Sequence, residues 1–316
     1  MTEINAVSAA RRKMREILDR DTVTVMPGGF SPLYARMAEE AGFECFFLAG
    51  SQMSAFLLGV PDNGIIGLRD MADHACHAAA RTSIPLQLDG DTGFGNAVNA
   101  YFAVRELAAT GIAALNLEDQ EAPKKSATLA GRRCIPVDEA VGKLQAANEA
   151  RNEIDPEFLI CARNDTMGAE GSDFGEALER CIAYVEDGKA DYVWLNSPDT
   201  RENLAKACEQ IPAPVLTIWG GGEPQPTVEE YHDMGVRIAL FPVCAATAGM
   251  QATWHVLNDL RDRGPQALKD YFAKMAEGPY GLVNQKDLIG SQKVRKLEDD
   301  YLPDSQKRDY DNTWGH

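Results

Sequence analysis

The sequence lacks the features that mark several common classes of protein. Its seven cysteines are scattered along 316 residues with no CxxC pair and no zinc-ligand spacing, so we expect free thiols rather than disulfides. No apolar stretch approaches the roughly 18 residues of a membrane-spanning helix. Only 31 Lys and Arg stand against 48 Asp and Glu, and a net charge of -17 disfavours binding to a phosphate backbone. We therefore predict a cytoplasmic protein without nucleic-acid or membrane partners.

Linkers and phosphate-binding motifs are also missing. No Pro-rich, Ser-rich or low-complexity tract divides the chain, and neither GxxxxGK nor GxGxxG occurs in its glycine-rich stretches, GDTGFGN and WGGGEP. With 45% hydrophobic and 25% charged residues, the composition is ordinary for a globular protein. We expect one large domain without a phosphate-binding loop.

Short apolar runs alternate with longer helical patterns, which is typical of repeated βα units and a parallel sheet. The runs are TVTVMPG, CFFLAG, PLQLDGD, AALNLED, FLICARND, DYVWLNS, PVLTIWG and RIALFPV. Eight is the number of strands that closes a (β/α)8 barrel. The sequence therefore predicts an α/β protein, a single TIM-type barrel domain over residues 1–316, with an extra N-terminal helix and a C-terminal helical extension over 265–316.

Two acidic residues, Asp89 and Asp91, follow the third apolar run directly. Side chains two apart on a strand point the same way, about 6 to 7 Å from each other, so these carboxylates should face the same space. Their repulsion would cost about 2 kcal/mol at an effective dielectric constant near 20. Either they cap the next helix and hydrogen-bond the loop, or a divalent cation lies between them.

More polar residues follow other predicted strands. They are Asp62 after the second, Glu118 and Asp119 after the fourth, Arg163 on the fifth and Asn196 on the sixth. Active sites of barrels form at this end of the strands. Several carboxylates at one mouth need a cation, and oxygen ligands suit Mg²⁺, with Mn²⁺ as an alternative. Arg163 could then grip the carboxylate or phosphonate of a small anionic substrate.

Five stretches, taken in order, resemble the isocitrate lyase/phosphoenolpyruvate mutase superfamily. They are AGSQMSAFLLGVPDNG, LDGDTGFGN, NLEDQEAPKK, ICARNDT and LVNQKDLIGSQKVRKLEDDYLP. Within it, the chain is most similar to the 2-methylisocitrate and 2,3-dimethylmalate lyases, which cleave a C–C bond of a 2-hydroxy dicarboxylate and release an α-keto acid. The resemblance implies the family's barrel, Mg²⁺ as cofactor, and a homotetramer whose C-terminal helix is exchanged between subunits.

The same resemblance implies roles for individual residues. Asp89 would bind the metal directly, and metal-bound waters would be held by Asp62, Asp91 and Glu118. The backbone N–H groups of Gly50 and Ser51 would face the substrate. Arg163 would bind the substrate carboxylate, with Asn196 lining the same site.

The loop after the fourth strand departs from the lyase pattern, which is Lys-Lys/Arg-Cys-Gly-His. Here it reads KKSATLAGRR, so Lys124 remains while Ser126, Ala127 and Thr128 replace the Cys, Gly and His. Phosphonopyruvate-processing members carry Asn or Thr at the cysteine position. Their loop continues to a Gly-Arg pair, as this loop does at Gly131 and Arg132. A serine hydroxyl, unlike a thiol of pKa about 8.5, cannot exchange a proton unaided near neutral pH. We expect Ser126 to donate a hydrogen bond or relay a proton.

We therefore predict a Mg²⁺-dependent lyase that cleaves a C–C bond of a small 2-hydroxy or 2-oxo (di)carboxylic acid through an enolate-type intermediate. Its catalytic residues would be Lys124, Ser126, Arg163 and Glu118, with the loop over 121–134 closing on the substrate. Two alternatives remain open. One is a hydrolase, decarboxylase or mutase acting on a phosphonopyruvate- or oxaloacetate-type substrate. The other is a barrel that binds a metabolite without turning it over, because the loop thiol is missing.

Overall fold

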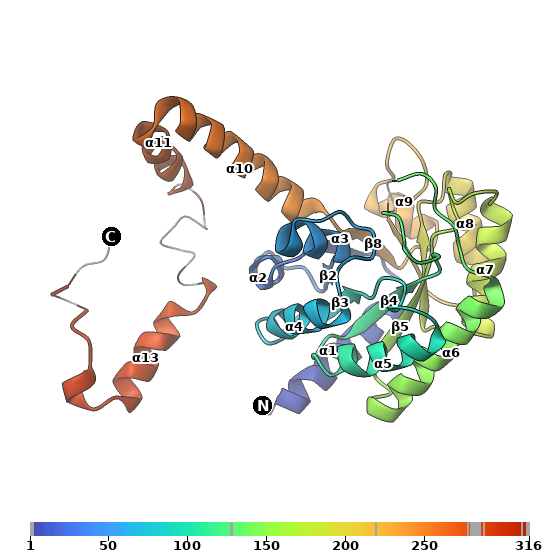
Figure 1. The fold of residues 1–316 in the computed structure, drawn as a ribbon, viewed down its shortest axis with the longest axis horizontal. Helices are drawn as coiled ribbons and strands as arrows, with labels where there is room; N and C mark the ends of the chain where they lie inside the picture. The colour runs from blue at the N-terminus through green and yellow to red at the C-terminus, as the bar shows by residue number, and fades with distance from the viewer. Residues whose placement is uncertain are drawn as a thin grey trace. The chain divides into compact units, whose positions relative to one another are not determined.

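The computed structural model describes residues 3–126, 129–218, 220–276, 278, 286, 288–310 and 312–313. The chain divides into two compact units, Met1–Thr247 and Ala248–His316. The first unit is a closed barrel of eight parallel strands in sequence order (Figure 1). This confirms the predicted (β/α)8 architecture, and each predicted apolar run overlaps one of the strands.

Apart from the exposed Phe241 at the end of β8 and the half-buried Val25 of β1, the strand residues are buried, as expected for parallel strands covered by helices. The strands are β1 (Thr24–Gly29), β2 (Phe46–Leu48), β3 (Leu86–Asp89), β4 (Ala114–Glu118), β5 (Leu159–Asn164), β6 (Tyr192–Asn196), β7 (Val215–Ile218) and β8 (Ile238–Phe241). The barrel closes where Thr24 of β1 pairs with Ile238 of β8. All the carboxyl ends therefore point to one mouth.

Helices follow the strands and cover the barrel. They are α2 (Pro32–Glu40), α3 (Gly50–Met53), the π-helical turn η1 (Ser54–Leu58), α4 (Leu68–Ala79), α5 (Ala97–Ala108), α6 (Val137–Ile154), α7 (Phe174–Glu186), α8 (Arg201–Gln210) and α9 (Val228–Asp233). In α7, Asp173 caps the first turn by accepting a hydrogen bond from the Glu176 amide. The buried residues Ala177, Cys181 and Tyr184 recur at helical spacing, so one face of α7 packs on the barrel.

The amino-terminal end of the barrel is covered by α1 (Glu3–Asp19), the predicted N-terminal helix. Its residues Met14 and Ile17 pack in one buried cluster with Met26 and Phe47 of the strands. Arg11 of the same helix is buried. It donates to the carbonyl oxygen of Ala108, the last residue of α5, at 2.5 Å, and to that of Ile112, just beyond this helix, at 3.2 Å. Because this end is filled, the opposite mouth is the one left for a site.

Beyond the barrel the chain is helical. α10 (Cys244–Arg263) leads into the second unit, which also contains α11 (Pro265–Met275), α13 (Ser291–Tyr301) and the 3-10 turn η2 (Asp304–Gln306). Exchange of this segment between subunits stays a prediction. The tail LVNQKDLIGSQKVRKLEDDYLP carries apolar residues that an exchanged helix would bury against a neighbouring subunit. Leu282 and Val283 lie outside the described residues, and Leu288 is buried. Ile289, Val294 and Leu297 are exposed. No helix in the described part of the chain is long and apolar enough to cross a bilayer.

Candidate active site

The turn after β3 brings Asp89 and Asp91 to the same space, but not in the way that strand geometry predicts. The strand ends at Asp89, and Asp91 adopts a left-handed backbone with φ of 47°. Gly90 allows the turn, because a Cβ there would lie 2.5 Å from the carbonyl oxygen of Asn116. The Asp91 amide donates to Asp89 Oδ1 at 3.3 Å. The acidic pair is therefore built by a tight turn rather than by strand pleating.

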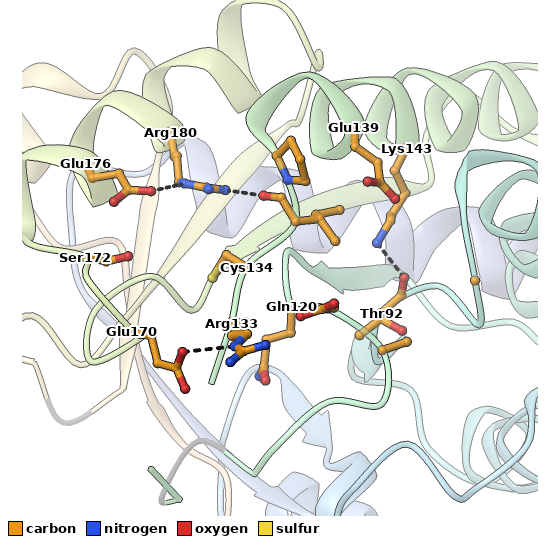
Figure 2. Close-up of a pocket in the computed structure, with 15 residues that line it drawn as sticks. Thr92, Gln120, Arg133, Cys134, Glu139, Lys143, Glu170, Ser172, Glu176 and Arg180 are labelled. Atoms are coloured by element: carbon orange, nitrogen blue, oxygen red, sulfur yellow. Dashed lines mark hydrogen bonds and ion pairs between the residues drawn. The ribbon is translucent and has the colours of Figure 1, made fainter. Parts of the chain in front are cut away.

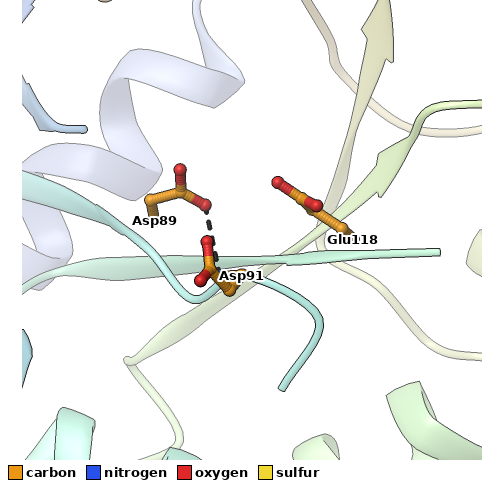
Figure 3. Close-up of side chains that lie close together, drawn as sticks. All are labelled: Asp89, Asp91 and Glu118. Atoms are coloured by element: carbon orange, nitrogen blue, oxygen red, sulfur yellow. Dashed lines mark hydrogen bonds between the residues drawn. The ribbon is translucent and has the colours of Figure 1, made fainter. Parts of the chain in front are cut away.

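Glu118, the last residue of β4, completes a buried acidic cluster with this pair (Figure 3). Asp89, Asp91 and Glu118 each offer a carboxylate oxygen, and these oxygens lie within 4.8 Å of one another. Three buried acids at this separation could hold a metal ion. An all-oxygen set suits Mg²⁺ or Mn²⁺ better than zinc.

Lys124 extends from the loop after β4 into the acidic cluster. Its Nζ lies 2.9 Å from Asp62 Oδ1 and 3.2 Å from Glu118 Oε1, and it also pairs with Asp91. Only 1% of the lysine side chain is exposed. Asn63 donates to the Lys124 carbonyl at 3.1 Å, which ties this loop to the one after β2. Lys124 thus joins Asp62, which comes from a separate loop, to the carboxylates of β3 and β4.

The electrostatics of the cluster favour added positive charge. Burial raises the pKa of Glu118 to about 8 and that of Asp91 to about 6, against the opposing effect of Lys124. Burial also acts on Asp89, but there the charges of Lys124 and Arg163 outweigh it and hold the pKa of Asp89 below its usual value. The same acids overcome the desolvation of Lys124 and raise its pKa well above normal. Lys124 is therefore a firmly protonated ammonium.

Arg163 on β5 lies beside the cluster in a position fixed on several sides. Its Nη1 is 2.8 Å from Glu118 Oε1, and its Nε is 3.0 Å from Asp165 Oδ2. The guanidinium carbon stacks 4.3 Å from the ring centroid of Trp194 on β6. Asn196 at the end of β6 donates to Asp165 Oδ1 at 2.6 Å. The two predicted residues Arg163 and Asn196 therefore meet through Asp165.

The remaining predicted residues lie around this group. The Gly50 amide, at the start of α3, donates to Asp89 Oδ2 at 3.3 Å, and Ser51 follows in the same turn. Ser126 is half-buried, and its carbonyl accepts from the Leu129 amide at 2.8 Å. The other two loop replacements, Ala127 and Thr128, fall outside the described residues.

Two polar residues of the site were not singled out from the sequence. Asn116 donates to Asp89 Oδ1 at 2.9 Å, and Asp165 binds Arg163. Asn116 precedes Glu118 by two residues, and Asp165 follows Arg163 by two. The period of a strand was therefore the signal that could have placed both on the inward face.

A separate pocket of about 610 Å³ lies on the outer side of the loop after β4 (Figure 2). Its walls come from residues 120–122 and 133–136 together with α6 and α7. Two pairs of charged side chains line it, Arg133 with Glu170 at 2.9 Å and Arg180 with Glu176 at 3.0 Å. The acidic cluster does not line this pocket, so we place the candidate active site at the cluster.

Comparison with known proteins agrees with this geometry. Residues 14–260 match the family described as phosphoenolpyruvate phosphomutase. The chain belongs to this family. The family resemblance inferred from the motifs is thereby confirmed, as is the likeness to dimethylmalate and methylisocitrate lyases.

Three members of the phosphoenolpyruvate mutase/isocitrate lyase superfamily illustrate the match. The chain is 34% identical to 2,3-dimethylmalate lyase of Eubacterium barkeri, over 92% of this chain and 97% of that protein. It is also 34% identical to 2-methylisocitrate lyase of Aeropyrum pernix, over 90% of this chain and 89% of that one. The solved structure of phosphonopyruvate hydrolase with oxalate and Mg²⁺ superposes with a TM-score of 0.81 at 28% identity, covering 93% of this chain and 100% of that one.

Proposed function

We propose that this protein is a Mg²⁺-dependent lyase that cleaves a C–C bond of a small 2-hydroxy or 2-oxo (di)carboxylic acid. The observation that carries the proposal is the buried cluster of Asp89, Asp91 and Glu118 beside the cations Lys124 and Arg163. Similarity to named C–C lyases along most of the chain supports the reaction type. A member of the same superfamily binds oxalate together with Mg²⁺, which supports the choice of metal and of an anionic substrate.

The donor set of the cluster fits Mg²⁺. The carboxylate oxygens of Asp91 and one of Asp62 are buried and accept no hydrogen bond from the described residues, although Lys124 pairs with both. Asp89 would bind the ion directly, and Asp62, Asp91 and Glu118 would hold its waters. The ion would supply Lewis-acid stabilisation for the negative charge of an enolate-type oxygen.

The other site residues bind the substrate and move its proton. Arg163 presents a fixed guanidinium to a substrate carboxylate. The amides of Gly50 and Ser51 lie in the first turn of α3 and would face a developing oxyanion once Asp89, which accepts from the Gly50 amide here, binds the metal ion. Lys124, which projects into the acidic cluster, would carry the proton, and Ser126 would donate a hydrogen bond from the loop.

Product analysis with a substrate panel tests the proposal. Malate, citramalate, oxaloacetate and phosphonopyruvate would each be incubated with protein and Mg²⁺, and keto acid, oxalate, acetate and inorganic phosphate would be quantified. A C–C lyase should release a keto acid from a 2-hydroxy dicarboxylate. Excess EDTA should abolish the release and added Mg²⁺ should restore it, with Mn²⁺ as a second activator. Full activity in EDTA would refute the metal-dependent mechanism.

The same panel distinguishes the alternatives. Phosphate release from phosphonopyruvate, or oxalate and acetate from oxaloacetate, would identify a hydrolase. The loop favours this as the second candidate, because Ser126 stands where lyases carry cysteine. Tight oxalate binding by calorimetry without any product would indicate a metabolite-binding barrel.

We also propose that the protein works as a cytoplasmic homotetramer, in which the C-terminal segment packs on a neighbouring subunit. The second unit leaves large apolar side chains exposed, and such surface is usually covered by a partner. Among them are Met250, Trp254, Leu257, Ile289, Val294 and Leu297. A monodisperse monomer in light scattering at micromolar concentration would contradict the assembly.

A further inference from the structure

Arg132 lies on the returning arm of the loop after β4 and is nearly fully buried, with 6% exposure. Its Nη2 donates to the Met167 carbonyl at 2.6 Å. Its Nη1 lies 3.5 Å from Asp165 Oδ1, and neither Nη1 nor Nε has a hydrogen-bond acceptor among the described residues. Burying a guanidinium costs free energy unless its charge is paired and its N–H groups are hydrogen-bonded. The placement therefore calls for a function.

Asp165 is the carboxylate that Arg132 shares with the candidate active site. The Oδ1 atom that Arg132 approaches also accepts from Arg163 Nη2 at 3.0 Å and from Asn196 at 2.6 Å. Asp165 is fully buried, and its own amide donates to Asp119 at 2.8 Å. One fixed carboxylate thus connects the loop after β4 to the guanidinium that faces the acidic cluster.

The charges explain why a second arginine is needed. Arg163 lies between two carboxylates, Asp165 on one side and Glu118 on the other. If Arg163 were the only cation beside Asp165, its charge would be largely neutralised before an anionic substrate arrived. Arg132 takes a share of the Asp165 charge and leaves Arg163 more positive toward the barrel mouth.

We propose that Arg132 is a positioning residue that acts through Asp165 to set the orientation of Arg163 and its affinity for the substrate carboxylate. The inference rests on the proposed function, in which Arg163 binds that carboxylate. It adds a residue whose polar contacts are with Met167 and Asp165 and not with the acidic cluster. It also links the loop after β4 to substrate binding.

Trp194 provides a reporter that does not depend on turnover. The Arg163 guanidinium lies over its ring at 4.3 Å, so a displaced cation should change the indole emission. Replacing Trp219, Trp254 and Trp314 with phenylalanine leaves Trp194 as the single tryptophan of the four. The emission maximum and intensity of this protein then follow the position of Arg163.

The experiment compares R132M with R133M in this background. Arg133 is the matched control, because it is the next residue, its side chain is 65% exposed, and it pairs with Glu170 instead of Asp165. Oxalate with saturating Mg²⁺ is the probe, titrated by calorimetry. R132M should weaken oxalate binding by about tenfold or more, the effect of losing a charge-assisted contact, and should shift the Trp194 emission. R133M should change neither.

R132K keeps the charge but cannot reach both Met167 and Asp165 with one ammonium, so its affinity should fall between wild type and R132M. It also covers the case in which R132M does not fold, as judged by circular dichroism. Where turnover is measurable, R132M should raise KM more than it lowers kcat. Wild-type oxalate affinity together with unchanged Trp194 emission in R132M, or in R132K if R132M does not fold, would overturn the inference.

The outcome separates this inference from the proposed function. If no substrate is cleaved but both R132M effects are found, the role of Arg132 stands and the lyase assignment fails. If cleavage is found but R132M behaves like R133M in affinity and emission, the lyase assignment stands and the role of Arg132 fails.

Discussion

Replacing Lys124 with methionine should destabilise the protein strongly when no metal is present. The ammonium lies within 3.2 Å of Asp62 and Glu118, pairs with Asp91, and has a side chain that is 1% exposed. Breaking a buried ion pair by removing one partner costs about 3–5 kcal/mol. Protonation of Glu118 and Asp91 limits the cost here, because their pKa values are already raised to about 8 and about 6 and rise further once Lys124, which lowers both, is removed.

We therefore expect a loss near the lower bound, about 3 kcal/mol. With an unfolding entropy of about 2.1 cal/mol/K per residue, each kcal/mol lowers the melting temperature of a 316-residue chain by about 1.5 °C, so Lys124→Met should melt about 4–5 °C below wild type in EDTA. Mg²⁺ at a hundred times its Kd stabilises the folded state by about 2.7 kcal/mol. Because the ion replaces the missing positive charge, saturating Mg²⁺ should raise the melting temperature of the variant more than that of wild type.

Thermal unfolding in EDTA and in excess Mg²⁺ measures both effects. Lys125→Met is the control, because Lys125 is the adjacent lysine and is only half-buried. Lys124→Met should stay inactive even when Mg²⁺ restores its stability, since the proposed proton carrier is lost. Equal melting temperatures of the two variants in EDTA, or equal stabilisation of Lys124→Met and wild type by Mg²⁺, would refute the electrostatic argument.

Three further predictions test other parts of the molecule. Asp89→Ala should reduce kcat/KM and Mg²⁺ affinity more than Asp91→Ala does. We expect Asp91→Ala to lower both by about 10- to 100-fold, because Asp91 would act on the ion through a bound water. Equal losses for the two variants in kinetics and calorimetry would contradict that order. Ser126→Thr should be tolerated and Ser126→Ala should slow turnover about 5- to 30-fold, whereas a loss beyond about a thousandfold would make position 126 a central proton-transfer group. Partial burial raises the pKa of Asp155, but the hydrogen bond from the Glu157 backbone amide and the charge of Arg11 outweigh burial and hold this pKa below its usual value. The ionised Asp155 carboxylate therefore stabilises the fold above about pH 4, and this stabilisation is lost at lower pH. Asp155→Asn should therefore be less stable than wild type by about 1 kcal/mol at pH 7, and the difference in denaturant unfolding should shrink as the pH falls below about 4; a gap that persists at pH 2 would exclude the carboxylate as its cause.

Much of the fold could be predicted from local patterns. Seven of the eight strands lie within an apolar run recognised in the sequence, and β1 passes the end of its run by Gly29 alone, because a parallel strand covered on both faces must be apolar nearly throughout. The location of the acids followed from the same pattern, since residues at the carboxyl ends of parallel strands share one mouth. This pattern alone indicates that Asp89, Glu118 and Arg163 lie at the mouth.

Contacts between loops could not be predicted by that reasoning. Lys124 meets Asp62 from a position 62 residues further along the chain, and Arg132 meets Asp165 from another loop. Even the pairing of Asp89 with Asp91 arises from a left-handed turn, although strand geometry predicts the same proximity.

The sequence by itself determined the barrel and the acidic residues at its mouth, because the periodicity of a strand and the burial of its faces are local properties that each segment carries. Only the tertiary structure decided which cations compensate those acids. Strand closure and loop conformation set the distances between Lys124, Arg132 and their carboxylates, and a Coulomb interaction in a buried site depends steeply on those distances. No spacing along the chain encodes them.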